Sequence, residues 1–149
     1  MASLLALFVL VSLSAFFSLS ETALTSVSRV KIKKMAEEKH FGAKSLKKLR
    51  EDPNKMLATI LVGNNLVNLA AASLATFMFF ELFAKNSFLN EGLTVAVSTI
   101  VMTFIILVFG EIVPKTSAMK HSEKLASSVA PVILAFSLVL TPVISLLDR

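Results

Sequence analysis

The sequence of 149 residues contains no cysteine, no tryptophan and no tyrosine, and only 17% of its residues are charged. Without cysteine, disulfide bonds and thiolate metal sites are excluded. Without tryptophan and tyrosine, an aromatic belt at a membrane interface can be built only from phenylalanine. The two histidines, His40 and His121, lie in polar stretches. We therefore expect both to be solvated rather than to act as metal ligands.

The residues that are present are mostly apolar. Hydrophobic residues make up 55% of the chain, and the mean hydropathy is +0.77. This composition is too apolar for a soluble domain, and the apolar runs are long enough to cross a bilayer. The sequence predicts an all-α membrane protein with three transmembrane helices, over about residues 2–27, 54–83 and 91–113.

The charged residues predict the orientation of these helices. Residues 29–55 carry ten lysines and arginines against four acids, whereas residues 81–91 carry one lysine and two acids. The positive-inside rule makes the basic block cytoplasmic and places the N-terminus outside. Hydrophobic residues alternate with the lysines, and Gly42 divides the block, which predicts two amphipathic juxtamembrane helices over about 29–51. Anionic lipids of the inner leaflet fit this block better than nucleic acid does.

The last apolar stretch, residues 125–147, allows two interpretations. Its length would permit a fourth span. Pro131 and Pro142 each remove a helical hydrogen bond, and we expect them to break the continuous helix that a lipid-exposed span needs. The alternative is a bent segment that lies in the inner leaflet.

A carboxylate at membrane depth marks the third predicted span. Glu111 follows an apolar run, and an ionisable residue in this position is by default part of an ion or proton pathway. Pro114 has no N–H, so the carbonyl of Gly110 loses its helical partner beside that carboxylate. Two such oxygens suit a hard cation such as Mg²⁺ or Na⁺. The alternative is a kinked helix in which Glu111 pairs with Lys115 at the membrane surface.

Polar residues also recur along one face of the first predicted span. Ser14, Ser18, Glu21 and Thr25 are four, three and four residues apart. Each serine alone is more often bonded to its own backbone or placed where helices pack closely. Glu21 could equally pair with a lysine of the basic block.

Three asparagines lie within five residues of the second predicted span. Asn64 and Asn68 are four residues apart, and Asn65 and Asn68 are three apart, so at least two amides share a helix face. A single asparagine in a membrane helix would be explained by a hydrogen bond to a neighbouring helix. Three of them, preceded by Gly63, exceed what one helix contact needs, and amide oxygens can coordinate a hard cation.

Three segments, residues 13–24, 63–68 and 109–115, resemble the transmembrane module of the CorC/CNNM magnesium-transporter family. The resemblance covers nearly the whole chain. It implies a homodimer of three-span protomers, with cytoplasmic juxtamembrane helices over about 29–51 and 116–149, that exports Mg²⁺ in exchange for Na⁺. The family continues into cytosolic CBS domains, which we expect to follow Arg149 in a longer chain. A cytoplasmic C-terminus would then favour a final segment that does not span.

The resemblance also implies a set of ion ligands in a largely dehydrated site. We expect Pro114 to kink the helix there and Glu21 to be a second polar group, although vertebrate members carry asparagine at the position of Glu21. The implied ligands are Ser14, Ser18, Asn64, Asn65, Asn68, Gly110 and Glu111.

The implied function has two alternatives. One is a dimeric Mg²⁺-sensing membrane scaffold that regulates another channel. The other is a proton- or Na⁺-coupled carrier of another substrate, with Glu111 as the proton site. No nucleophile–base pair or phosphate-binding glycine loop is found, so we expect no enzyme activity. The expected location is the plasma or inner membrane, with several spans.

Overall fold

The computed structural model describes residues 1–83 and 91–147, and every regular element within these two ranges is a helix. Side chains are described up to residue 141. The predicted all-α class is therefore confirmed for the described residues. Most of the outer loop predicted between residues 81 and 91 lies outside them.

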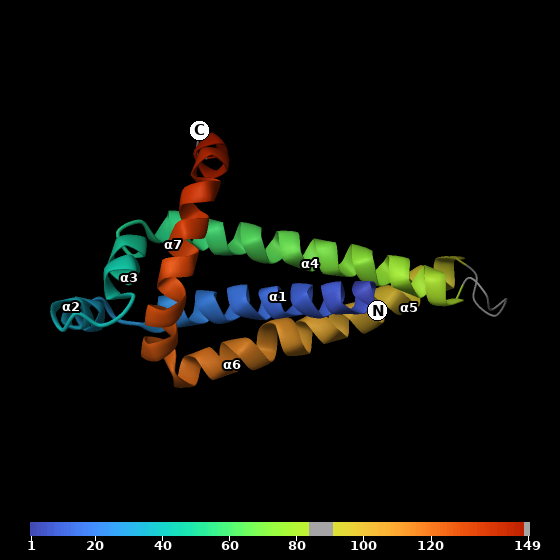
Figure 1. The fold of residues 1–149 in the computed structure, drawn as a ribbon, viewed down its shortest axis with the longest axis horizontal. Helices are drawn as coiled ribbons and strands as arrows, with labels where there is room; N and C mark the ends of the chain where they lie inside the picture. Colours follow the sequence, from blue (N-terminus) through green and yellow to red (C-terminus); the bar gives the residue numbers. More distant parts are fainter. Residues whose placement is uncertain (84–90, 148–149) are drawn as a thin grey trace.

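Three long helices lie side by side (Figure 1). The central one is α1 (Ala2–Ser26), which contacts α4 (Pro53–Phe83) on one side. On the other side it contacts the π-helix η1 (Ile106–Ile112) and α6 (Val113–Lys120). These two continue the helix α5 (Glu91–Ile105), which itself packs against α4. The chain runs in opposite directions along α1 and α4 (Figure 1). The boundaries of α1 and α4 agree closely with the predicted spans.

Two short helices occupy the basic block at one end of the bundle (Figure 1). They are α2 (Arg29–Glu37) and α3 (Ala43–Leu49), and Gly42 between them has a left-handed φ of 71°. The basic block is thus divided at Gly42, as predicted, and its place at the membrane surface stays a prediction. Glycine suits this position because a residue without Cβ adopts a left-handed φ readily. At the start of α4, the Lys55 N–H donates to the Asp52 carboxylate at 3.0 Å. Asp52 is therefore the N-cap of α4, and proline occupies the first helical position.

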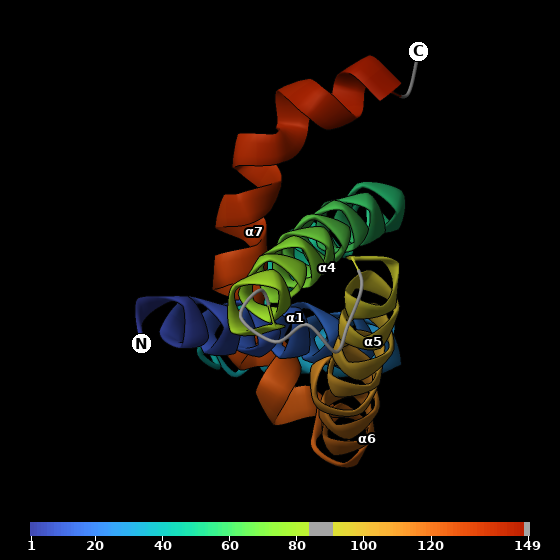
Figure 2. The same ribbon diagram turned by 90° about the vertical axis from the view of Figure 1, so that its right-hand side faces the viewer.

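The last helix, α7 (Ser122–Leu147), differs from the prediction. It runs across the end of the bundle in Figure 1 and bends towards its C-terminal end in Figure 2. Pro131 and Pro142 do not interrupt it, so the expectation of a broken helix is wrong. A proline removes one hydrogen bond, and the packing of the helix face can offset that loss.

Four helices of the described part are long and apolar enough to cross a membrane. They are α1, α4, the continuous helix Glu91–Lys120, and the part of α7 from Ser122 to Thr141. Many of their large apolar side chains are exposed, among them Phe8, Leu66, Ile100 and Phe104. The chain is thus a multi-pass membrane protein, and which of the four helices span stays a prediction.

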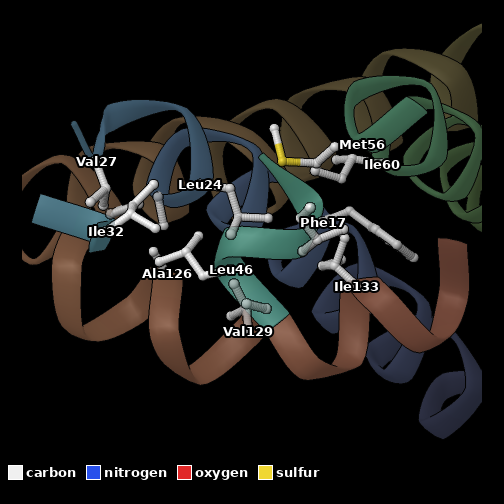
Figure 3. Packing of buried hydrophobic residues seen from close by; sticks show 14 residues of the cluster. Phe17, Leu24, Val27, Ile32, Leu46, Met56, Ile60, Ala126, Val129 and Ile133 are labelled. Carbon is white, nitrogen blue, oxygen red and sulfur yellow. The ribbon is translucent and has the colours of Figure 1, made fainter. Parts of the chain in front are cut away.

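A cluster of buried apolar side chains joins α7 to the bundle (Figure 3). Leu24 of α1 and Leu46 of α3 are fully buried there, as is Ile133 of α7. Each such side chain contributes roughly 1.5–3 kcal/mol by burial. This cluster holds the C-terminal end of α1, which follows Ser14 and Ser18, and so helps to position the candidate site.

Candidate cation site in the helix bundle

The third long helix changes its hydrogen-bond register at the predicted motif. Residues Ile106–Ile112 form a π-helix, and the Val113 N–H donates to the Val108 carbonyl five residues earlier. A π segment inside an α-helix is rare and is frequently found at functional sites. Pro114 follows this π-helix and has no N–H. The Gly110 carbonyl, four residues earlier, therefore receives no α-helical hydrogen bond from position 114. Instead of a simple kink, the structure has a widened turn that contains Gly110 and Glu111.

Three helices meet at Ser14. Its hydroxyl is fully buried and donates to the Asn64 Oδ1 of α4 at 3.4 Å, which is at the long limit for such a bond. On the opposite side lies Gly110 of η1, where a Cβ would come within 2.7 Å of the Ser14 Oγ. The absence of a side chain at Gly110 is therefore what lets the π-helix approach α1. Of the predicted ligands, these three are brought together directly.

Two more predicted ligands carry buried oxygens without a partner. The Ser18 Oγ and the Asn68 Oδ1 have no hydrogen-bond donor or acceptor among the described residues. A buried polar atom left unpaired costs roughly 1–3 kcal/mol. By contrast, Ser12 and Ser20 of the same helix donate to their own backbone. The backbone-bonded interpretation of Ser14 and Ser18 is thus wrong for both residues.

The unpaired oxygens lie on either side of the Ser14–Asn64 contact. Because α1 and α4 are antiparallel, Ser18 is one turn, about 6 Å, from Ser14 in one direction. Asn68 is one turn from Asn64 in the other. Helical side chains lean towards the N-terminus of their own helix, which here means towards the contact. The polar groups therefore form a column inside the bundle.

The remaining candidates are less central. Asn65 is exposed, so its side chain lies outside this column. Glu111 is half-buried and forms no ion pair with a described residue. The expected alternative, a Glu111–Lys115 pair, is not formed, because Lys115 pairs with Glu21 at 3.1 Å. This pair joins α6 to α1, and its partial exposure limits it to about 1 kcal/mol or less.

The donor set favours a hard cation held mostly by neutral oxygens. No group of three or more His, Cys, Asp or Glu that could hold a metal exists in the described ranges 1–83 and 91–147. Adjacent ligand oxygens around Mg²⁺ are about 3 Å apart, since each lies roughly 2.0–2.1 Å from the ion. The 3.4 Å between the Ser14 Oγ and the Asn64 Oδ1 is close to that spacing. His40 and His121 are both exposed, as expected.

Sequence reasoning missed one contact that shapes the site. A Cβ on Gly63 would lie 2.5 Å from the Phe17 ring, so this glycine admits the ring between α1 and α4 one residue before Asn64. Phe17 also packs against Phe136 of α7, with ring centroids 5.5 Å apart. The sequence did offer one sign of this contact, because Gly63, a residue without a side chain, directly precedes the asparagines. The bulky partner of Gly63 was not visible in the sequence.

We expect Ser18→Ala to have opposite effects on stability and on ion binding. Removing an unpaired buried hydroxyl should raise the free energy of unfolding by up to about 1 kcal/mol. Mg²⁺ affinity should fall at the same time if this oxygen is a ligand. The matched control is Ser20→Ala, which removes a buried hydroxyl bonded to the Phe16 carbonyl. Thermal unfolding and calorimetry on both variants measure the difference, and lower stability in Ser18→Ala would contradict the assignment.

We expect Pro114→Ala to lower transport although no candidate side-chain ligand changes. Alanine supplies the missing N–H, so an α-helical bond to the Gly110 carbonyl can form and the widened turn can relax. The matched control is Pro131→Ala, which makes the same change inside α7. Flux into liposomes compares the two variants. Transport at the unsubstituted rate in Pro114→Ala would show that Pro114 only shapes the helix.

The fold and this polar column define a helical membrane protein with a candidate cation site between its long helices. Over residues 4–149 the chain matches the family described as Cyclin M transmembrane N-terminal domain, CNNM. The chain belongs to this family, and the resemblance noted from its motifs is confirmed.

Several curated proteins are similar to this chain. The UPF0053 inner membrane protein YfjD of Escherichia coli is 34% identical over 136 residues, which is 91% of this chain and 30% of that protein. A UPF0053 protein of Haemophilus influenzae is 41% identical over 114 residues, or 76% of this chain and 26% of that protein. The Polyamine export protein of Salmonella typhimurium is 34% identical over 65 residues, or 44% of this chain and 14% of that protein. The chain thus spans less than a third of the length of these relatives.

Proposed function

We propose that this chain is the membrane module of a Mg²⁺ transporter, which exports the ion in exchange for Na⁺. The observation that carries the proposal is the column of buried oxygens around Ser14 and Asn64, two of which have no hydrogen-bond partner among the residues that the structure describes. Unpaired buried oxygens stabilise a dehydrated cation better than paired ones, because no existing bond must be broken. Glu111 in the π-helix would supply the one negative charge. We infer a transport module rather than an enzyme.

Mg²⁺ gives up its water reluctantly, so the site must replace several waters at once. Ser14 of α1 and Asn64 of α4 would bind the ion with their side chains. The Gly110 carbonyl and the Glu111 carboxylate of η1 would bind it from the third helix. Ser18 and Asn68 would bind the ion as it moves along the column. The exposed Asn65 is assigned to the outer surface of the protomer, where we propose that a second copy packs in the homodimer.

Ion flux tests this proposal against the scaffold alternative. The chain, and separately a full-length protein that contains it, would be placed in liposomes with a trapped Mg²⁺ indicator. We expect Mg²⁺ flux that depends on an opposing Na⁺ gradient and is insensitive to a pH gradient. Mg²⁺ binding without flux in either protein would favour a sensor. Dependence on the pH gradient would instead favour a proton-coupled carrier with Glu111 as its proton site.

A second candidate is a carrier of polyamines. It is favoured by the relative named Polyamine export protein, whose matched segment covers 44% of this chain. Protonated amines also need oxygen acceptors, and a column of hydroxyl and amide oxygens provides them. Spermidine in the same liposomes distinguishes the two functions. Spermidine flux that Mg²⁺ does not inhibit would favour the polyamine carrier.

We propose three spans, made by α1, α4 and the helix Glu91–Lys120, with the N-terminus outside and the C-terminus cytoplasmic. The crosswise direction of α7 supports this topology, because a helix that crosses the other three does not share their path through a bilayer (Figure 1). α7, α2 and α3 would then lie at the inner face, against anionic lipid, and CBS domains would follow in the cytosol.

We expect a cysteine introduced at Arg149 to be protected from a membrane-impermeant thiol reagent in intact cells. Labelling should appear only after the cells are permeabilised. The readout is simple because the chain has no cysteine of its own. Position 149 itself lies outside the described residues. A cysteine at the exposed Ala2 is the matched control and should be labelled from outside. Labelling of position 149 in intact cells would support four spans.

A further inference from the structure

Four basic side chains surround one small cavity between α2 and α3. The cavity has a volume of about 300 Å³ and is lined by Arg29, Ile32, Lys33, Lys47 and Arg50. Arg29 and Lys33 are four residues apart on α2, and Lys47 and Arg50 are three apart on α3, so each pair shares a helix face. Ile32 is buried in the apolar cluster that joins these helices to α7, so the cavity has a packed base.

None of these four cations is neutralised within the described part of the chain. The ion pairs there involve Lys31, Lys34, His40 and Lys115 instead. No acidic residue of the described ranges lines the cavity. Glu51 and Asp52 follow Arg50 in the sequence but line a different cavity together with Lys48 and Lys55. Four positive charges are therefore gathered around this cavity without a counter-charge from the described residues, and an anion that enters it would be attracted by all four.

The Arg50 side chain gives a second, independent sign of a ligand. Its Nε is buried and has no hydrogen-bond partner in the described ranges. A buried guanidinium N–H without an acceptor is costly. The Arg50 side chain also lines the cavity, and a guanidinium has further N–H groups for which a phosphate oxygen is a strong acceptor. The dipole at the C-terminal end of α3 favours Lys47 and Arg50, but its half charge cannot balance four cations. Helix capping alone thus does not account for the cluster.

We propose that this cavity binds a phosphomonoester group with about two negative charges. The arginines would bind its oxygens in the paired geometry of the guanidinium, and the lysines would act as point charges around it. The volume is at the lower end for ligand pockets, so the group that enters is small. The same chemistry occurs in a lipid headgroup such as phosphatidic acid and in free phosphate. This site is separate from the cation column and does not depend on transport.

The test uses the full chain, purified in neutral detergent without phosphate, and three probes. They are dioctanoyl phosphatidic acid, dioctanoyl phosphatidylglycerol (a diester with a single charge) and inorganic phosphate. Calorimetry should show saturable binding of phosphatidic acid that is about tenfold tighter than binding of phosphatidylglycerol. The double variant Lys33→Gln/Lys47→Gln should weaken it by at least about tenfold, because each basic residue contributes substantially to anion binding at a membrane surface. Both lysines are exposed, so the variant should fold.

The matched control is Lys39→Gln/Lys44→Gln, which removes the same charge from exposed positions outside the cavity. It should change the affinity by less than about twofold. Binding of inorganic phosphate as tight as that of phosphatidic acid would identify a free phosphate as the source, and binding of the lipid alone would identify the headgroup. Equal losses in both double variants, equal affinity for the two lipids, or no saturable binding would overturn the proposal. Stronger competition by polyglutamate than by phosphate would also overturn it, in favour of an acidic protein segment.

Discussion

Replacing Glu111 by glutamine should lower Mg²⁺ affinity by at least about a hundredfold while the protein stays folded. Two unit charges 4 Å apart interact by about 4 kcal/mol at an effective dielectric constant of 20, and Mg²⁺ carries two charges. Desolvation removes part of this gain, and the glutamine amide oxygen retains a weak ligand. Glu111 is half-buried and has no ion pair with a described residue, so no other described group compensates its charge. Calorimetry on purified protein measures the loss.

The matched control for this substitution is Glu123→Gln. Glu123 carries the same charge, but it lies in the first turn of α7 and pairs with Lys31 of α2 outside the column. We expect its Mg²⁺ affinity to stay within about twofold of the unsubstituted protein. Unchanged affinity in a monodisperse Glu111→Gln protein would remove Glu111 from the site. Equal losses in both variants would point to a general effect of surface charge.

The long helices could be predicted from sequence because their signals are local. The lengths of the apolar runs predicted α1 and α4 with bounds that differ from the observed helix ends by at most one residue. The approach of Ser14 to Asn64 could also be anticipated, since polar residues at helical spacing inside apolar segments must face one another rather than lipid. Helical spacing allowed Asn68 to share a face with either Asn64 or Asn65, and only the structure shows that Asn65 is exposed.

Features that depend on distant contacts could not be predicted. The π-helix forms where Gly110 packs against Ser14, nearly a hundred residues away in the sequence, and nothing in the local motif specifies that register. The sequence allowed Lys115 to pair with either Glu111 or Glu21. It pairs with Glu21 because α6 packs against α1, which the sequence does not show. The continuity of α7 through Pro131 depends on the buried face that includes Ile133, whose partners come from other helices.

Gly42→Ala should strongly destabilise the basic end of the bundle. A Cβ at this position would lie 1.8 Å from the Ser127 carbonyl oxygen, which belongs to the backbone of α7 and cannot move alone. The φ of 71° adds a cost of roughly 1–2 kcal/mol for any residue with a Cβ. Relieving the clash would require α3 and α7 to separate, which would open the apolar cluster around Leu46.

We therefore expect Gly42→Ala to lower the free energy of unfolding by about 2 kcal/mol or more, and the melting temperature in detergent by roughly 5 °C or more. Gly92→Ala is the matched control, because Gly92 is exposed in the first turn of α5. Alanine there should be neutral or stabilising, since it favours helix over glycine by about 1 kcal/mol. If Gly42→Ala melted within a degree of the unsubstituted protein, α7 could not be packed against Gly42 as the structure has it. The crosswise position of α7, on which the three-span topology rests, would then have to be abandoned.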